Sequence, residues 1–215
     1  MDIPQILISL FVVLFAITIH EASHGWAAYK MGDPTAYAMG RITLNPVAHI
    51  DPIGTILLPL ILVIMGAPPF GWAKPVPVNP LNLKDPRRDN LIISAAGPLS
   101  NFSVAFIAFL GIQLFKFMNP GLFQTYGGFS GLASGIFLIL YYTVLINIIL
   151  AVFNLIPIPP LDGSGVLMGL ISEEAAEKYE RIRPYGFIIL LLLIMTGFIG
   201  RILGVIMRFV NIFIF

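Results

Sequence analysis

The chain has 215 residues, of which 58% are hydrophobic and 11% are charged. Soluble globular domains carry roughly 25% charged residues, and a soluble domain of this size could not hide so much apolar surface. The net charge of +1 gives no basis for binding nucleic acid. The chain has no cysteine, so only His and carboxylates could hold a metal. We expect an all-α polytopic membrane protein with a single membrane-embedded domain over residues 1–215.

The first apolar run, Ile3–Tyr29, is long enough to cross the ~30 Å hydrocarbon layer as a helix. It is too long for the core of a signal peptide and lacks a basic start, so we expect it to be retained. Gly32, Asp33 and Pro34 should end it. The turn-rich stretch Thr35–Pro52 predicts a small irregular or β region after this first helix.

Later apolar runs predict further membrane segments. Ile53–Gly66 is short for a span and fits a re-entrant element at least as well. The proline-rich stretch Ala67–Pro86 excludes a helix. Asn90–Phe115 and Gly135–Ile156 read as full spans, separated by the Gly-rich loop Gly121–Ser134.

The last part of the chain mixes a charged and an apolar pattern. Glu173–Arg183 predicts a solvated helix at the water edge. Phe187–Ile199 and Ile202–Phe215, separated by Gly200-Arg201, form either one span with a surface helix or a final pair. About five to six membrane segments are therefore expected in total.

His20, Glu21 and His24 carry the clearest chemical signal, because they lie inside the first apolar run. Positions i and i+4 of a helix share a face, so both imidazoles can bind one ion while Glu21 lies beside it. Ionisable side chains in a membrane-length apolar segment are costly and mark function. The pattern predicts a metal site with a general base, and the competing interpretation is a cluster that merely ties helices together.

A hydrolytic zinc site takes three protein ligands and leaves one position for water, so one further ligand is needed. A third His six residues after the second is excluded, because that position is Lys30. The Glu residues of the charged stretch should face water: they are Glu173, Glu174, Glu177 and Glu180. Asp162 lies at the end of an apolar span, with prolines before it and Gly163 after it. This rigid exit from the helix orients a single carboxylate. Its alternative role is an ordinary Asp-Gly turn.

The number of membrane crossings before Asp162 tests whether Asp162 can be the third metal ligand. If Ile53–Gly66 crossed the bilayer, the bias of loop cations would place the N-terminus on the cytoplasmic side. His24 would then lie about 30 Å along the helix from the membrane face that holds Asp162, and the ligands could not meet. If the segment enters and returns, nine loop cations fall on one side and Lys116 alone on the other, a stronger bias. We therefore expect a multi-pass protein of the cell membrane, with its N-terminus outside and its site towards the cytoplasmic side.

Three motifs in order resemble the site-two proteases, which are intramembrane zinc metalloproteases. They are His20–Gly25 in a membrane helix, Ala96–Leu99 opening a later one, and Asn154–Gly163 ending the next. The resemblance is to small bacterial and archaeal members, and no attached peptide-binding or nucleotide-sensing domain is expected. It places a catalytic core at about residues 1–170 and C-terminal membrane helices at about 171–215.

The resemblance implies a role for each site residue. His20, His24 and Asp162 would hold one Zn²⁺ per chain, and Glu21 would be the catalytic carboxylate. Asn154 would position or stabilise the reacting group, with an interhelical hydrogen bond as its alternative role. The substrate would be a transmembrane helix of another membrane protein, cut in or near the bilayer after part of it unwinds.

Two other classes compete with this interpretation. One is a transporter with His20, Glu21 and Asp162 on an ion path, which does not explain their i, i+1, i+4 order. The other is a metal-binding scaffold or inactive protease homologue.

His49, beside Asp51, is expected to be structural or interfacial, with a substrate-side or second-metal role as the alternative. The sequence leaves open which helix is cut and whether the chain forms a homo-oligomer.

Overall fold

The structure is a computed structural model that describes residues 3–66, 71–119 and 132–215. The described part is helical and contains no β-strand. Its long helices are α1 (Ile3–Met31), α4 (Pro86–Met118) and α5 (Leu132–Asn154). Its shorter helices and helical turns are α2 (Thr35–Ala38), η1 (Pro46–His49), η2 (Pro52–Leu57), α3 (Leu58–Ile64), η3 (Pro80–Asn82), α6 (Asp162–Leu170), α7 (Glu173–Glu180), η5 (Arg183–Tyr185), α8 (Gly186–Met195) and α9 (Phe198–Ile214).

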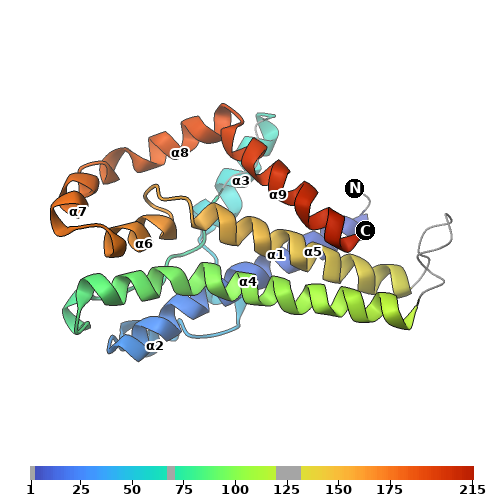
Figure 1. The fold of residues 1–215 in the computed structure, drawn as a ribbon, viewed down its shortest axis with the longest axis horizontal. Coiled ribbons are helices and arrows are strands. Elements are labelled where there is room, and N and C mark those ends of the chain that lie inside the picture. Colours follow the sequence, from blue (N-terminus) through green and yellow to red (C-terminus); the bar gives the residue numbers. More distant parts are fainter. Residues whose placement is uncertain (1–2, 67–70, 120–131) are drawn as a thin grey trace.

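Helices α1, α4 and α5 are the ones long and apolar enough to cross a membrane. They lie side by side, and α4 runs opposite to the other two (Figure 1). Helices α8 and α9 pass the same test only as a pair bent by 63°. The described chain thus has three to four candidate spans, and the expected five to six membrane segments are not confirmed. The apolar helix Pro52–Leu62 is too short to be counted as a span.

Asp33 ties the end of α1 to the start of α4. Its fully buried carboxylate accepts hydrogen bonds from the Asn79 backbone nitrogen and the Asn82 side chain, both at 2.7 Å. Since these residues lie just before α4, the chain between α1 and α4 returns to the end of the bundle that it left. This return agrees with the re-entrant segment that the charge bias favours, and its entry into the bilayer stays a prediction.

Of the irregular or β region expected between α1 and η2, the β alternative is not confirmed: the described chain there is irregular apart from the short helix α2 and the turn η1. The reason is that short polar side chains satisfy the backbone donors locally, which competes with strand pairing. Asp33 accepts from the Thr35 backbone and hydroxyl, Asn45 accepts from the Val47 backbone, and Asp51 accepts from the second and third residues of η2.

The C-terminal helices break at a different place from the one expected. The interruption lies at Gly197 rather than at Gly200-Arg201, because Gly197 has φ = +72°, a backbone conformation that favours glycine. Helix α9 therefore runs unbroken from Phe198 to Ile214 and packs on α5. Most of the expected Gly-rich loop lies outside the described residues.

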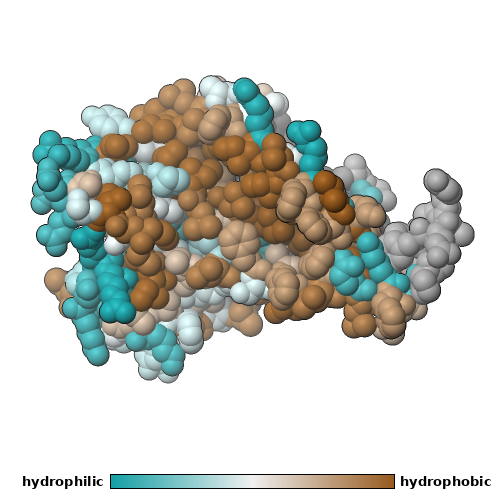
Figure 2. Space-filling view, in the orientation of Figure 1, coloured by the Kyte–Doolittle hydropathy of each residue, from teal (hydrophilic) through white to brown (hydrophobic). Residues whose placement is uncertain are grey.

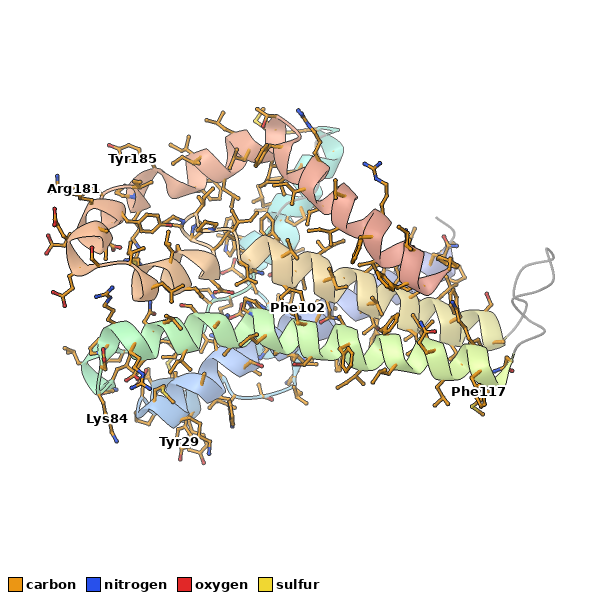
Figure 3. All side chains as sticks on the ribbon, in the orientation of Figure 1. Tyr29, Lys84, Phe102, Phe117, Arg181 and Tyr185 are labelled. Carbon is orange, nitrogen blue, oxygen red and sulfur yellow. The ribbon has the colours of Figure 1, made fainter. Side chains whose placement is uncertain are left out.

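The surface has one polar end and an apolar middle. Figure 2 shows hydrophilic residues gathered over α7 and the neighbouring end of the bundle, and a broad hydrophobic surface across the bundle itself. Figure 3 places Tyr29, Lys84 and Arg181 at the polar end and Phe117 at the opposite end. Such a distribution of polar and apolar surface is typical of a membrane-embedded bundle. The larger polar surface lies at the end of the bundle where α1 ends.

Candidate metal centre

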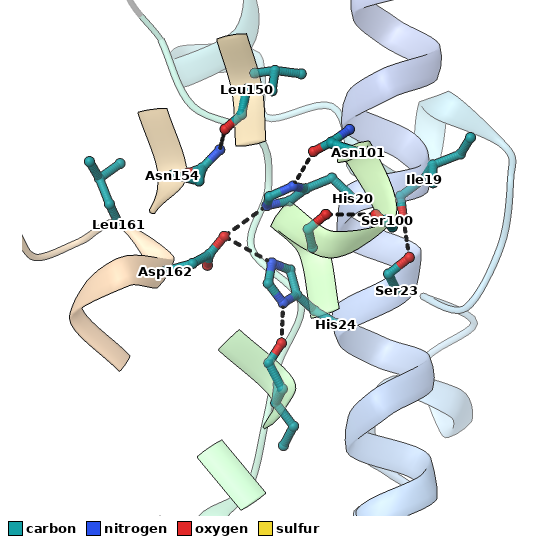
Figure 4. A network of polar contacts seen from close by, with 12 residues as sticks. Ile19, His20, Ser23, His24, Ser100, Asn101, Leu150, Asn154, Leu161 and Asp162 are labelled. Carbon is teal, nitrogen blue, oxygen red and sulfur yellow. Dashed lines mark hydrogen bonds and ion pairs between the residues drawn. The ribbon is translucent and has the colours of Figure 1, made fainter. Parts of the chain in front are cut away.

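Helices α1 and α6 bring three ligand atoms together. His20 and His24 lie one turn apart on α1, and Asp162 is the first residue of α6. The Oδ2 atom of Asp162 is 2.9 Å from Nε2 of His20 and 3.3 Å from Nε2 of His24. Figure 4 shows both rings turned towards this carboxylate. The structure therefore places side by side the three residues that the sequence singles out.

The other ring nitrogen of each histidine already has a hydrogen-bond partner. His24 Nδ1 lies 2.7 Å from the carbonyl oxygen of Ile93, which can only accept, so the proton is on Nδ1. His20 Nδ1 lies 2.6 Å from Oδ1 of Asn101 and is likewise the donor. Two Nε2 lone pairs and a carboxylate oxygen thus face one another.

With both rings neutral, three acceptors that converge in this way repel one another unless a proton or a metal ion lies between them. All three ligand atoms fall within 4.8 Å of one another. Two imidazole nitrogens and one carboxylate oxygen are a ligand set typical of catalytic zinc, which keeps a fourth position for water. The residues present therefore fit a zinc ion, and the hydrogen bonds to the Nδ1 atoms are the outer contacts that orient its ligands.

Gly97 of α4 provides the space that the two rings occupy. A Cβ atom at this position would lie 2.4 Å from Nε2 of His24 and 2.6 Å from Nε2 of His20. Real Cβ contacts are essentially never this short. Only glycine therefore lets α4 pack against both ligands, which explains why small residues precede Pro98 in a helix interior.

The approach of Asp162 to the histidines depends on close packing around the start of α6. A Cβ on Gly163 would lie 2.2 Å from the carbonyl oxygen of Leu155, and one on Gly165 would lie 2.1 Å from Oγ of Ser94 in α4. Ser164 donates to the carbonyl of Leu161 at 2.7 Å and closes the first turn. The two glycines hold α6 against the end of α5 and against α4, which fixes the carboxylate.

The other residues singled out by the sequence lie at different distances from this centre. Glu21 is half-buried on α1, and within the described residues it forms no ion pair. Asn154 donates to the carbonyl of Leu150 at 3.0 Å, within its own helix α5 (Figure 4). His49 is buried away from the metal group and contacts the carbonyl of Thr43 at 3.0 Å.

Sequence reasoning missed the residues that hold the two rings in place. Asn101 is an amide inside an apolar membrane-length run, the same signal that identified Asn154, and it could have been found in this way. Gly97 enters the sequence analysis only as part of the motif Ala96–Leu99. The Ile93 carbonyl leaves no trace in the sequence, because every residue carries one.

Fold and site define an all-helical membrane protein with a two-histidine, one-carboxylate metal centre and a glutamate next to the first histidine. The profile of "Peptidase family M50" matches residues 8–196. A Bacillus subtilis protein named "Putative zinc metalloprotease YwhC" is 39% identical over 90% of this chain and 81% of its own length. "Putative zinc metalloprotease Rip2" of Mycolicibacterium smegmatis is 27% identical over 87% of this chain and 66% of its own.

The chain therefore belongs to peptidase family M50, the site-two protease family, and the resemblance stated from its motifs is confirmed. Family and relatives support an intramembrane zinc metalloprotease and do not favour the transporter or scaffold. No solved structure matches the chain.

Proposed function

We propose that His20, His24 and Asp162 hold one zinc ion per chain and that Glu21 acts as the general base. One observation carries this proposal: the Nδ1 atoms of both rings are committed to Asn101 and to the Ile93 carbonyl, so both Nε2 atoms face the Asp162 carboxylate and are available to bind one metal ion. Zinc bound by such a set lowers the pKa of a water molecule towards about 7.

The protein's own groups then have distinct tasks. Glu21 takes the proton of the attacking water and passes it to the leaving nitrogen of the peptide bond. Asn154 supplies an amide donor to the oxyanion through the second N–H of its side chain, since the first donates to the carbonyl of Leu150. Buried surroundings strengthen both interactions, because the site lies inside a helical bundle.

The substrate that we propose is a transmembrane helix of another membrane protein. His24 lies seven residues before the end of α1, which is about 10 Å along the helix, so the site is close to the polar end of the bundle. A substrate helix must unwind near this end to expose a peptide bond. The bias of positive charge assigns this end to the cytoplasmic side of the cell membrane.

The experiment is a comparison of the wild type with Glu21→Gln, both purified as the full chain. We expect both to hold one equivalent of zinc by elemental analysis, and only the wild type to cut single-span membrane peptides reconstituted with it, as read by mass spectrometry. Glu177→Gln, on the exposed helix α7, is the matched control and should cut normally. Cleavage by Glu21→Gln at the rate of the wild type would refute this mechanism.

A further inference from the structure

Asn101 and Asn147 form a buried chain of hydrogen bonds that leads away from the metal centre through three helices. Both side chains are fully buried. His20 of α1 meets Oδ1 of Asn101 in α4 at 2.6 Å, and Nδ2 of Asn101 donates to Oδ1 of Asn147 in α5 at 2.8 Å. Nδ2 of Asn147 donates in turn to the carbonyl of Thr143 at 2.8 Å.

Two backbone carbonyls fix the direction of every bond in this chain. Carbonyl oxygens can only accept, so the nitrogen end of Asn147 must face Thr143, and its oxygen must face Asn101. Asn101 also donates to the carbonyl of Ala16 at 3.1 Å, which fixes its own nitrogen end. Its oxygen therefore faces His20, and the proton of that ring is held on Nδ1.

We propose that the amides of Asn101 and Asn147 are a relay that sets the tautomer and orientation of the metal ligand His20. Asn147 is a positioning residue that acts through Asn101, and within the described residues its side chain hydrogen-bonds to Asn101 and Thr143 rather than to a metal ligand. The donors that link His20 to Asn101, Asn101 to Asn147 and Asn147 to Thr143 all point from the histidine towards α5. Each of these bonds polarises the next, and Nε2 becomes a better electron donor. The inference rests on the proposed metal centre.

The relay also explains why a polar group is kept in the middle of α5. Asp162 follows the end of α5, whereas His20 is on α1, so the two ligands come from helices that could rotate or slide independently. The hydrogen bond between Asn101 and Asn147 fixes α5 relative to α4, and α4 holds His20. One chain of amides thus aligns the histidine with the helix that leads to the carboxylate.

The test measures zinc affinity of the purified full-length protein by competition with a chelator. Asn101→Leu should weaken binding by about 10–100-fold, the usual loss when the partner of a metal-binding histidine is removed. Asn147→Leu should weaken it less and in the same direction. The double variant should bind no more weakly than Asn101→Leu alone, because Asn147 acts through Asn101.

Thr18→Val is the matched control, since Thr18 is buried on α1, the helix of His20, and among the described residues its hydroxyl donates to the carbonyl of Leu14. It should bind zinc like the wild type. Additive losses in the double variant, or wild-type affinity in both single variants, would overturn the relay.

A second measurement separates the relay from the metal centre. Nitrogen NMR of ¹⁵N-histidine-labelled, metal-free protein, at a pH where the rings are neutral, should show His20 protonated on Nδ1 in the wild type. The Nδ1–H fraction should fall in Asn101→Leu. A wild-type ring protonated on Nε2 would overturn the relay, whereas a wild type with this tautomer that binds no zinc would overturn only the proposed function.

Discussion

Replacement of Gly97 by alanine tests how the metal centre is packed. The added methyl group would lie 2.4 Å from Nε2 of His24 and 2.6 Å from Nε2 of His20, whereas ordinary van der Waals contact begins at 3.4 Å. The rings must therefore move by about 1 Å, or α4 must move away from α1. Metal sites keep ligand distances within about 0.2 Å of their normal values, so this shift is several times what zinc tolerates.

The rings cannot simply turn aside, because their far sides are fixed. His20 is held by Asn101 at 2.6 Å and His24 by the Ile93 carbonyl at 2.7 Å. Alanine is itself a better helix former than glycine by about 0.5–1 kcal/mol, so α4 should remain folded. We expect Gly97→Ala to lose bound zinc and to cut membrane peptides about 100-fold more slowly.

The measurements are zinc content after purification and the rate of peptide cleavage. Gly200→Ala is a matched control, because a Cβ at that position of α9 meets nothing within 4 Å. It should retain zinc and activity. If Gly97→Ala binds zinc as the wild type does, the close approach of α4 to the ligands does not define the centre, and the reasoning fails.

The remaining predictions concern the amide of Asn154, proposed as a donor to the oxyanion, and the hydrogen bonds of Asp33 at the end of α1. Asn154→Ala should keep zinc and lose about 100–1,000-fold in cleavage rate; a normal rate in kinetic assays would assign the amide a structural role. Burial raises the pKa of Asp33, but hydrogen bonds from Asn82, Thr35 and Asn79 outweigh burial and hold that pKa below its usual value of 3.8. The stability contributed by the charged carboxylate is therefore present above pH 3.8 and lost as the pH falls through the lowered pKa. Asp33→Asn should weaken the pH dependence of stability in acid unfolding followed by circular dichroism. An unchanged unfolding curve would show that the hydrogen bonds of Asp33 do not contribute.

The sequence alone determined the elements whose signals are local. Length and apolarity identified α1, α4 and α5 as spans, because twenty apolar residues suffice to cross a bilayer whatever lies beside them. The i, i+4 spacing of His20 and His24 fixed their shared face, since helical periodicity needs no tertiary contact. Asp162 was also predicted, because the rigid chain around it and the charge bias of the loops left few other candidates.

Only the tertiary structure decided the features that depend on distant partners. The β alternative for the irregular region before Pro52 is not confirmed, and periodicity does not reveal the hydrogen bond by which Asp33 joins this region to the distant Asn79. Gly97 lies in a sequence motif and Asn101 in an apolar run, but their contacts with the two histidines follow from which helix faces pack together. Hydrogen bonds between separate helices set the tautomers of His20 and His24, and no local pattern encodes such contacts.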